Sequence, residues 1–288
     1  MSELPVSVVI ATIGRASLVA DLVASILAGD DQPDEVLVVV QSRNVSTCEA
    51  LGALEHVTLV PSPQQGLSAA RNHGARRAQS EVVAFCDDDM RVARGWLRAL
   101  AEPVLSESRL VTTGSVERDP EDAGGIVPAL VLEPEPAVHT ARGPRDVLAG
   151  GNMAMRASDL EALGGFDERL GPGSHFPAAE DNDLGLRLLT SGYTIRYEPA
   201  ALVYHRAWRR SASYPVVRWR YGRGKGAFYA KNSSPGDRYG RERASADLGA
   251  RARRLPRVLH RPVYAAGEVL YAAGVVAGGL EWLLRERR

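Results

Sequence analysis

The sequence predicts an α/β fold: a mixed, mainly parallel sheet flanked by helices, with a basic helical extension at the C-terminal end. Two observations predict the sheet. Short β-branched apolar runs recur through the first third of the chain, and helical segments lie between them. The runs are apolar at successive positions, which is typical of parallel strands buried on both faces. Strands that alternate with helices in this way form βαβ units.

Local signals define the first elements in chain order. The first strand is the run VSVVIAT. Leu18, Leu22 and Ile26 recur at helical spacing in the first helix, which is expected to end at Gly29. Ser68 is expected to cap the third helix. The strands are expected at residues 6–12, 34–42, 57–62 and 81–87, and the helices between them at 16–29, 46–54 and 66–79.

The pattern is less regular after residue 87. Residues 117–146 are rich in Pro, Gly, Glu and Asp, and they predict a long loop. A further helix is expected at residues 180–192. A strand pair, or a strand and a turn, is expected at residues 195–205.

Charge is distributed unevenly along a chain whose net charge is zero. Residues 1–205 carry 16 basic and 29 acidic side chains, whereas residues 206–261 carry 16 basic and only three acidic ones. A basic segment that follows an acidic body predicts an anionic partner surface.

The cysteines and the apolar segments predict a cytoplasmic protein. Neither Cys48 nor Cys86 stands in a CxxC pair, so no zinc or redox site is indicated. Cys86 ends an apolar strand and is expected to be buried. The N-terminal residues lack a basic region followed by an apolar run, so no signal peptide is expected. No clear membrane span is expected either, because no run of 18 uncharged apolar residues occurs.

Three consecutive aspartates, Asp87, Asp88 and Asp89, directly follow the fourth strand. Ligands of open α/β sheets bind at this edge, and like charges so close together require something positive nearby. Carboxylates are ligands that Mg²⁺ and Mn²⁺ prefer, often together with substrate phosphates. The run predicts a divalent cation held with a diphosphate, with a solvated loop or a helix cap as the alternative.

Seven motifs follow one another between residues 6 and 205: SVVIATIGR, GLSAARNHGARRA, FCDDDM, GGNMAMR, GGFDERLGPG, AAEDNDLGLRLLTSGY and YEPAALVYH. Together they resemble the family 2 glycosyltransferases of the GT-A fold. The resemblance implies transfer of a sugar from a nucleoside diphosphate sugar to an acceptor hydroxyl, with inversion and with Mg²⁺ or Mn²⁺. A glycan, a lipid-linked molecule or a natural product would each fit as acceptor. The implied catalytic domain covers residues 1–215, and the extension covers 216–288.

By this resemblance the aspartates form a D-x-D element. Asp89 would contact the metal, and Asp87 the ribose or a metal-bound water. Asp88 would point toward the nucleotide. His205 would be a third metal ligand, because a neutral imidazole suits Mn²⁺. The alternative for His205 is a backbone hydrogen bond at a strand end.

The resemblance also implies the residues that bind the donor. Arg71 would lie near the diphosphate, or would form a salt bridge to the acidic body. Val40 stands where an aspartate often reads the base or ribose, so the nucleotide identity stays open and Gln41 is expected to substitute. The full set is Thr12, Arg15, Gln41, Arg71, Asp87, Asp88 and Asn152, with the Asn152 amide on sugar hydroxyls or in a plain turn.

Asp181 matches the aspartate that serves as general base in the family, and Glu180 would orient the acceptor. An inverting transfer needs one base to take the acceptor proton. Both carboxylates are also well placed to interact with a helix N-terminus, and this alternative is favoured for Asp183.

Arginines and aromatic residues are interleaved in residues 206–261. Such a segment could lie on an anionic membrane, placing the enzyme on the inner face. It could equally pack on the acidic body or on a second subunit of a homodimer, whereas nucleic acid is less favoured. Residues 262–284 are apolar but contain Glu268 and Glu281, which favours an interfacial or packing helix over a span.

Two other functions compete with glycosyl transfer. A sugar nucleotidyltransferase would carry a glycine-rich loop after the first strand, and ATIGRAS has a single glycine. A non-catalytic carbohydrate-binding protein would not need the aspartates at 87, 89 and 181.

Overall fold

The computed structural model describes residues 2–41, 51, 57–122, 124–127 and 129–285. The helix expected at residues 46–54 lies outside this range except for Leu51. The chain divides into two compact units. The sheet unit comprises Met1–Ala123, Ala129–Asp167 and Asp181–Ala207, and the helical unit comprises Gly124–Pro128, Glu168–Glu180 and Trp208–Arg288.

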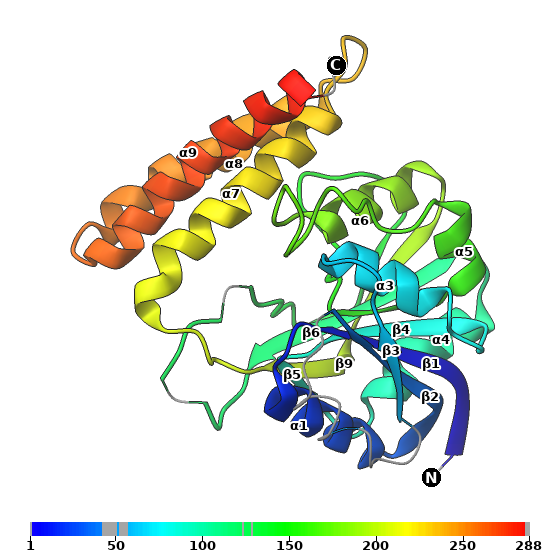
Figure 1. Ribbon diagram of the computed structural model, residues 1–288. Helices are drawn as coiled ribbons and strands as arrows, with labels where there is room; N and C mark the ends of the chain where they lie inside the picture. The colour runs from blue at the N-terminus through cyan, green and yellow to red at the C-terminus, as the bar shows by residue number, and fades with distance from the viewer. Residues whose placement is uncertain (1, 42–50, 52–56, 123, 128, 286–288) are drawn as a thin grey trace. The chain divides into compact units, whose positions relative to one another are not determined.

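The sheet unit is built on a mixed sheet of nine strands within the described residues (Figure 1). Eight of them follow the order β3-β2-β1-β4-β8-β6-β9-β5, and the ninth, β7, pairs with β9. The strands β1 to β4 pair in parallel, whereas β8 pairs antiparallel with both β4 and β6. The bounds are β1 Ser2–Thr12, β2 Asp31–Val40, β3 Val57–Pro61, β4 Val82–Asp87, β5 Met90–Val92, β6 Leu110–Arg118, β7 Ala137–His139, β8 Asn152–Arg156 and β9 Thr194–His205.

The strands predicted from the β-branched runs are confirmed as β1 to β4. The segment at residues 195–205 is one strand, β9, which pairs in parallel with β6 through a register shift. Strands β5, β6 and β8 were not foreseen, because their pairing partners lie far away in the sequence. The expected loop at 117–146 overlaps the end of β6 and contains β7.

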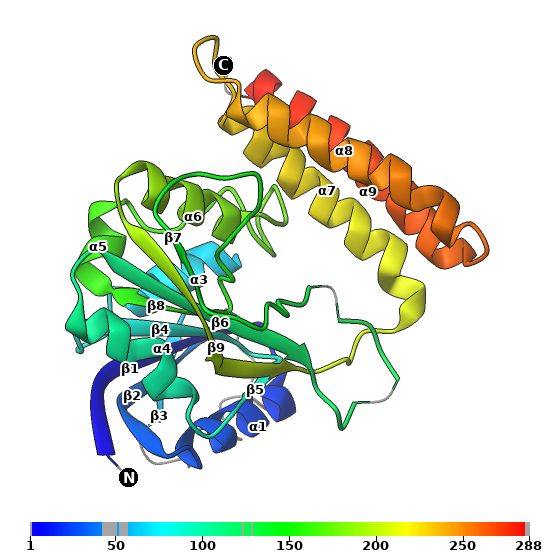
Figure 2. The ribbon, with the colours of Figure 1, turned by 180° about the vertical axis from the view of Figure 1, so that it is seen from behind.

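Helices cover both faces of the sheet, and successive strand residues point to opposite faces. Val8 and Ile10 of β1 belong to the core beneath α1 and α4, whereas Val9 and Ala11 belong to the core beneath α3, α5 and α6 (Figure 2). These helices are α1 Ala16–Leu27, α3 Leu67–Ala75, α4 Trp96–Ser106, α5 Ala157–Ala162 and α6 Glu180–Thr190.

The predicted cap of the third helix was wrong. Ser68 lies inside α3 and is fully buried, and the residue at the N-cap is Gly66, which makes no side-chain cap hydrogen bond. Gly66 has a φ of 123°, a conformation that a serine would adopt only with strain. The predicted burial of Cys86 is confirmed.

The helical unit contains three long helices: α7 Tyr214–Lys231, α8 Tyr239–Val258 and α9 Pro262–Arg285. Helices α7 and α9 touch backbone to backbone. A Cβ atom added at Gly226 would overlap the carbonyl of Val275, and one added at Gly278 would overlap the carbonyl of Arg223. The short 3₁₀ turn Ser211–Ser213 precedes α7. The helical extension predicted from the sequence is thus present.

Helix α9 differs from the expectation of no clear span. Its 24 residues are, by length and composition, long and apolar enough to cross a membrane, with a mean hydropathy of 1.4 over the most apolar window. A third of that window is buried. The core helix of a soluble protein passes the same test, so length and composition alone do not place α9 in a bilayer.

Candidate active site

The candidate site lies at the C-terminal edge of the parallel strands. Thr12 ends β1 and Asp87 ends β4, and the parallel register places Ala11 of β1 beside Asp87. This is the edge at which open α/β sheets bind their ligands. The run of aspartates is therefore positioned by two of the strands predicted from the sequence.

Two arginines pair with the three aspartates. Arg15 forks onto Asp88, with Nε at 3.0 Å and Nη2 at 2.5 Å from the carboxylate oxygens, and its Nη1 donates to Asp89 at 3.0 Å. Arg71, which is buried, donates from Nη2 to Asp87 Oδ1 at 2.6 Å. Part of the positive charge that the aspartates require is thus supplied by the protein itself, through two arginines that the sequence analysis expected near the donor.

Asp88 is the most deeply buried carboxylate of the run, with 1% of its surface exposed. Burial raises the pKa of Asp88 to about 7, although Arg15 and a hydrogen bond from Thr12 oppose that rise. Asp87 is the most accessible of the three, with 31% of its side chain exposed. Asp88 is thus enclosed by the protein, whereas solvent reaches Asp87.

Asp89 and His205 face each other across the antiparallel pair of β5 and β9, in which Met90 lies opposite His205. His205 Nδ1 lies 2.9 Å from the carbonyl of Arg206 and donates to it, which leaves Nε2 as the basic nitrogen. Nε2 lies 3.7 Å from Asp89 Oδ1. Such an orienting hydrogen bond on the far nitrogen is the usual arrangement for a histidine that ligates a metal.

Across the part of the chain that the structure describes, no three His, Cys, Asp or Glu side chains gather into a metal cage. The three-ligand set expected from Asp87, Asp89 and His205 is therefore not assembled in the described residues, and Asp87 is paired with Arg71. Asp89 and His205 alone fit a Mg²⁺ or Mn²⁺ ion, since such ions take few protein ligands when phosphate oxygens complete the shell.

The pair Gly150–Gly151, just before β8, lets the backbone pass close to both Asp87 and Asp181. A Cβ atom at Gly151 would overlap the Asp87 carboxylate, and one at Gly150 would lie 2.9 Å from both Arg71 Nη1 and Asp181 Cβ. The backbone N–H of Gly150 also points to Asp181 Oδ2 at 3.5 Å. The glycines are needed for close approach, and they connect Asp87, Arg71 and Asp181 into one site.

Asp181 lies in the first turn of α6 and is partly exposed, whereas Glu180 beside it is buried. The residue before them, Ala179, has a φ of 73°, a strained conformation for alanine. Asp183 is fully buried and accepts a hydrogen bond from Arg187 Nε at 2.9 Å, four residues further along the helix. Among these three carboxylates, Asp181 is therefore the most exposed.

Asn152 has a structural role in the core. Its Oδ1 accepts from Trp96 Nε1 at 2.8 Å, and its Nδ2 donates to the carbonyls of Ser115 and Ala201 at 2.9 and 2.8 Å. The residue is fully buried. The amide expected on sugar hydroxyls therefore ties β8 to α4, β6 and β9 instead.

Gln41 also holds backbone. Its Oε1 accepts from the N–H of Gly66 at 2.8 Å, which fixes the turn that leads into α3. Its own N–H donates to the carbonyl of Thr12 at 2.9 Å. Gln41 thus lies at the strand ends as expected, and its side-chain oxygen is bound to the backbone of the turn before α3.

Sequence reasoning missed the contribution of Phe166. Its backbone N–H and carbonyl exchange hydrogen bonds with the Asn72 side chain at 2.8 and 2.9 Å, and its ring lies 5.2 Å from the Arg71 guanidinium. The signal was the pair Gly164–Gly165, both at positive φ, which makes the turn. Phe166 thereby fixes α3 and holds Arg71 toward Asp87.

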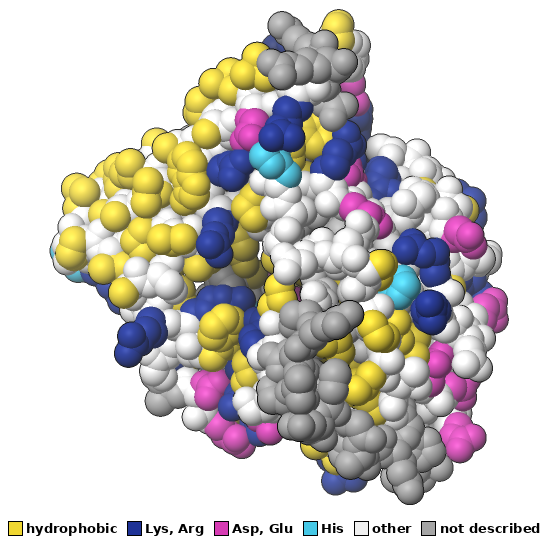
Figure 3. All heavy atoms as spheres, viewed as in Figure 1, with side chains coloured by type: hydrophobic (Ala, Val, Ile, Leu, Met, Phe, Trp, Pro, Cys, Tyr) yellow, Lys and Arg dark blue, Asp and Glu magenta, His cyan; other side chains and the backbone are white. Residues whose placement is uncertain are grey.

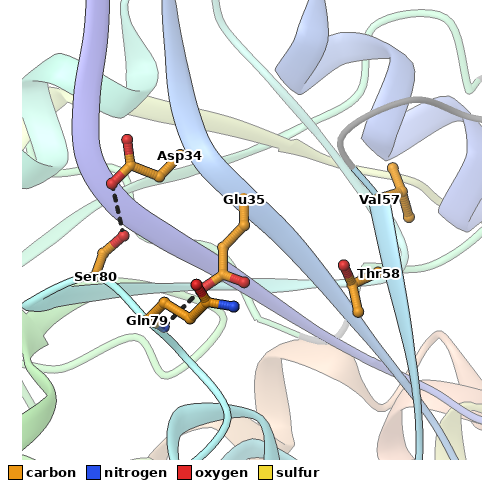
Figure 4. Close-up of a pocket in the computed structure, with 6 residues that line it drawn as sticks. All are labelled: Asp34, Glu35, Val57, Thr58, Gln79 and Ser80. Atoms are coloured by element: carbon orange, nitrogen blue, oxygen red, sulfur yellow. Dashed lines mark hydrogen bonds between the residues drawn. The ribbon is translucent and has the colours of Figure 1, made fainter.

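A separate cavity of about 570 Å³ lies at the opposite, N-terminal edge of the parallel strands (Figure 4). Ser80 Oγ donates there to Asp34 at 2.9 Å, and the N–H of Gln79 donates to Glu35 at 2.7 Å. The remaining lining residues are Val57 and Thr58. None of the residues expected to act in catalysis or binding lines it.

The curated relatives that the chain matches are glycosyltransferases. The chain is 30% identical over 168 residues to the pre-mycofactocin glycosyltransferase of Mycobacterium tuberculosis, covering 56% of this chain and 34% of that protein. It is 26% identical over 193 residues to polypeptide N-acetylgalactosaminyltransferase 8 of Drosophila melanogaster, covering 62% and 31%. The chain thus spans about a third of the length of these relatives.

Solved structures share the GT-A fold. The mannosyltransferase PcManGT from Pyrobaculum calidifontis, in complex with GDP-Man and Mn²⁺, aligns with a TM-score of 0.62 at 20% identity, covering 96% of this chain and 87% of that one. GalNAc-T7 with UDP, GalNAc and Mn²⁺ aligns with a TM-score of 0.55 at 20% identity, covering 78% and 49%. The family model described as glycosyl transferase family 2 matches residues 7–164, which is more than half of the chain. The family model matches more than half of the chain and the fold agrees with it, so the chain belongs to glycosyl transferase family 2.

Proposed function

We propose that this protein transfers a sugar from a nucleoside diphosphate sugar to an acceptor hydroxyl, with inversion and with a divalent cation. One observation carries the proposal: the Gly150–Gly151 turn and the ends of β1, β4 and β9 gather Asp87, Asp89, His205 and Asp181 at one edge of the sheet. Asp89 and His205 would form the end that binds the diphosphate of the donor, and Asp181 would form the end that binds the acceptor.

The donor end would be formed by Asp89 and His205 with a Mg²⁺ or Mn²⁺ ion. When bound, such an ion would offset the negative charge that develops on the departing diphosphate. Arg15 now contacts Asp89 and would share that carboxylate with the ion. Arg71 lies near Asp87 and would place further positive charge by the donor. The structures of PcManGT and GalNAc-T7 contain Mn²⁺, which supports this assignment.

The acceptor end would be formed by Asp181. As the acceptor oxygen bonds to C1 of the sugar, the bond from C1 to the diphosphate oxygen breaks and the nucleoside diphosphate leaves. The acceptor proton passes to Asp181, and attack on the face opposite the leaving group inverts C1. The hydrogen bond from the N–H of Asn182 to Asp181 Oδ1, 2.8 Å long, would keep the carboxylate oriented. Glu180, buried one residue earlier, would support the acceptor side.

The nucleotide is the open part of the proposal. Val40 ends β2 where the family often has an aspartate, and the oxygen of Gln41 is used by Gly66. PcManGT was solved with GDP-Man and GalNAc-T7 with UDP. A thermal-shift comparison of UDP, GDP and dTDP with Mn²⁺ would identify the base, because a ligand that binds only the folded state raises the melting temperature.

Calorimetry with the nucleoside diphosphate tests the proposal. We expect Mn²⁺ to strengthen binding in the wild-type protein, and EDTA to remove that gain. Asp89→Asn should bind the nucleotide equally with Mn²⁺ and with EDTA. Asp30→Asn is the matched control, because Asp30 is an exposed aspartate paired with Arg94. Wild-type affinity that is the same with Mn²⁺ and EDTA would contradict the metal assignment, and absence of sugar transfer with every donor would contradict the function.

A further inference from the structure

Helix α9 turns its apolar side chains outward. Every exposed position from Pro262 to Leu284 carries an apolar residue. The large ones are between 37% and 67% exposed, and they recur at helical spacing: Val263, Val269, Val276, Leu280, Leu283 and Leu284. Figure 3 shows the hydrophobic side chains gathered along α9.

The two glutamates of α9, Glu268 and Glu281, point the other way. Glu268 is 2% exposed and lies 3.3 Å from Arg251 and 3.6 Å from Arg254. Glu281 accepts from Arg223 Nη2 of α7 at 2.6 Å. A helix at a protein–water boundary shows the reverse arrangement, with its apolar stripe inward and its charges in water. A contiguous exposed apolar face of this kind marks an interaction surface.

Basic residues lie at the end of α8 where α9 begins. Arg253, Arg254, Arg257 and Arg261 are all exposed. In residues 208–285, Glu242 is the one acidic side chain that the structure leaves exposed, and it lies at the other end of α8. The apolar face is therefore bordered by exposed arginines with no exposed acidic side chain beside them in the described part of the chain, which matches an anionic surface.

The packing of α7 against α9 excludes a simple span. The two helices touch along their backbones at Gly222, Gly226, Gly274 and Gly278. Any bilayer around α9 would therefore also receive α7, with its cationic Arg218, Arg220, Arg223 and Lys225. Charged side chains at the bilayer centre are costly. An in-plane position, with one face in the lipid and the other on α7, avoids this.

We infer that the outward face of α9 docks in the plane of an anionic phospholipid membrane. The valines and leucines would enter the boundary between headgroups and acyl chains, and the arginines at the end of α8 would contact the lipid phosphates. The surface is distinct from the proposed site for sugar transfer, and it does not depend on that function.

Sedimentation of the full chain with vesicles tests the inference. We expect binding to phosphatidylcholine vesicles that contain a third of phosphatidylglycerol, weaker binding to pure phosphatidylcholine, and a loss of the difference at high salt. V276Q/L280Q should lower binding at least about tenfold, because two large apolar side chains leave the lipid. R257Q/R261Q should lower binding to the anionic vesicles alone, by about fivefold per arginine.

L132Q/V138Q is the matched control, because Leu132 and Val138 are both 60% exposed but lie in the sheet unit. It should bind like the wild-type chain. The inference is overturned if the wild-type chain does not sediment with anionic vesicles at low salt, or if V276Q/L280Q binds as well as the control. It is also overturned if V276Q/L280Q turns a dimer into a monomer or lowers the melting temperature without lipid, since a protein surface then covers the face.

Discussion

Arg15 and Arg71 hold the three aspartates through charge-assisted hydrogen bonds of 2.5–3.0 Å. Each carboxylate therefore has an arginine partner in the absence of a ligand. A cation that binds Asp89 must share it with Arg15. Asp181 accepts from the N–H groups of Gly150 and Asn182. The two halves of the proposed reaction therefore depend on different residues and can be separated by single substitutions.

The substitution Asp181→Asn is expected to lower kcat for transfer by roughly 10²- to 10⁴-fold, since a positioned base contributes about that factor. The nucleotide Kd should stay near the wild-type value, because Asp181 lies at the acceptor end. Measurement of both quantities on one preparation checks this. If the variant keeps near-wild-type kcat, the base is another residue, and Glu180 is tested next by the same pair of measurements.

At the scale of elements, two close approaches depend on glycine. The turn before β8 passes against the Asp87 carboxylate at Gly151, and α7 passes against α9 at Gly226. At Gly226 a side chain would meet backbone atoms of Val275, and at Gly151 it would meet the Asp87 carboxylate and push it aside. At other glycines of the chain an added Cβ atom has room, so the effect of alanine at Gly151 or Gly226 can be compared with its effect there.

Gly151→Ala is expected to displace Asp87 and to reduce both nucleotide affinity and kcat by about tenfold or more, since small displacements in a site have large effects. Gly143→Ala is the control, because a Cβ atom there meets nothing within 4 Å. Enzyme assays on the two variants decide the matter. Equal activity of the two variants would show that the turn at Gly151 can relax, and would contradict the prediction that the site needs a glycine there.

Gly226→Ala is expected to destabilise the protein by about 1–3 kcal/mol through overpacking against α9. Gly249→Ala should have the opposite sign and add about 0.5–1 kcal/mol, because Gly249 lies inside α8 and its nearest neighbour is the Arg253 side chain at 3.4 Å. Chemical denaturation of both variants measures the two free energies of unfolding. Stabilisation by Gly226→Ala would contradict the observed helix contact.

At the scale of the whole molecule, the basic segment predicted from the sequence is partly neutralised by its own unit. Arg251 and Arg254 are paired with Glu268, and Arg223 with Glu281. Glu281 also contacts His175 of the segment Glu168–Glu180, which leads to the acceptor end of the site. This one carboxylate therefore connects α9, α7 and the segment before Asp181.

The stability of the protein should depend on pH through Glu281. Burial tends to raise the pKa of Glu281, but Arg223 and His175 outweigh it and lower the pKa below its usual 4.5. A lowered folded-state pKa gives stability that is present above pH 4.5 and is lost as the pH falls through the folded value.

Glu281→Gln should lower the melting temperature at pH 7 and flatten its decline below pH 4.5. A change of less than about 1 kcal/mol is expected, because the side chain is 32% exposed. Glu242→Gln, at an exposed glutamate with a 3.9 Å contact to Arg238, is the control and should leave the curve unchanged. If the melting temperatures of the wild-type protein and of Glu281→Gln fall in parallel as the pH is lowered, Glu281 is not the source of the pH dependence.

The sequence by itself determined the strands β1 to β4, the helices between them that the structure describes, and the place of Asp87, Asp88 and Asp89. Each follows from local signals: a β-branched run ends, and the next residues stand at the edge where parallel strands finish. The motifs determined the family in the same way, and the charge count located the basic segment.

Only the tertiary structure decided how the distant parts meet. The insertion of β8 between β4 and β6 joins residues far apart in the chain, and it turned Asn152 into the core and brought Gly150 to Asp181. Likewise, composition showed that residues 262–284 are mostly apolar, but packing against α7 decided which of these side chains face outward. Local patterns determine which residues share a face of an element. What that face meets depends on non-local pairing, which no short window of sequence contains.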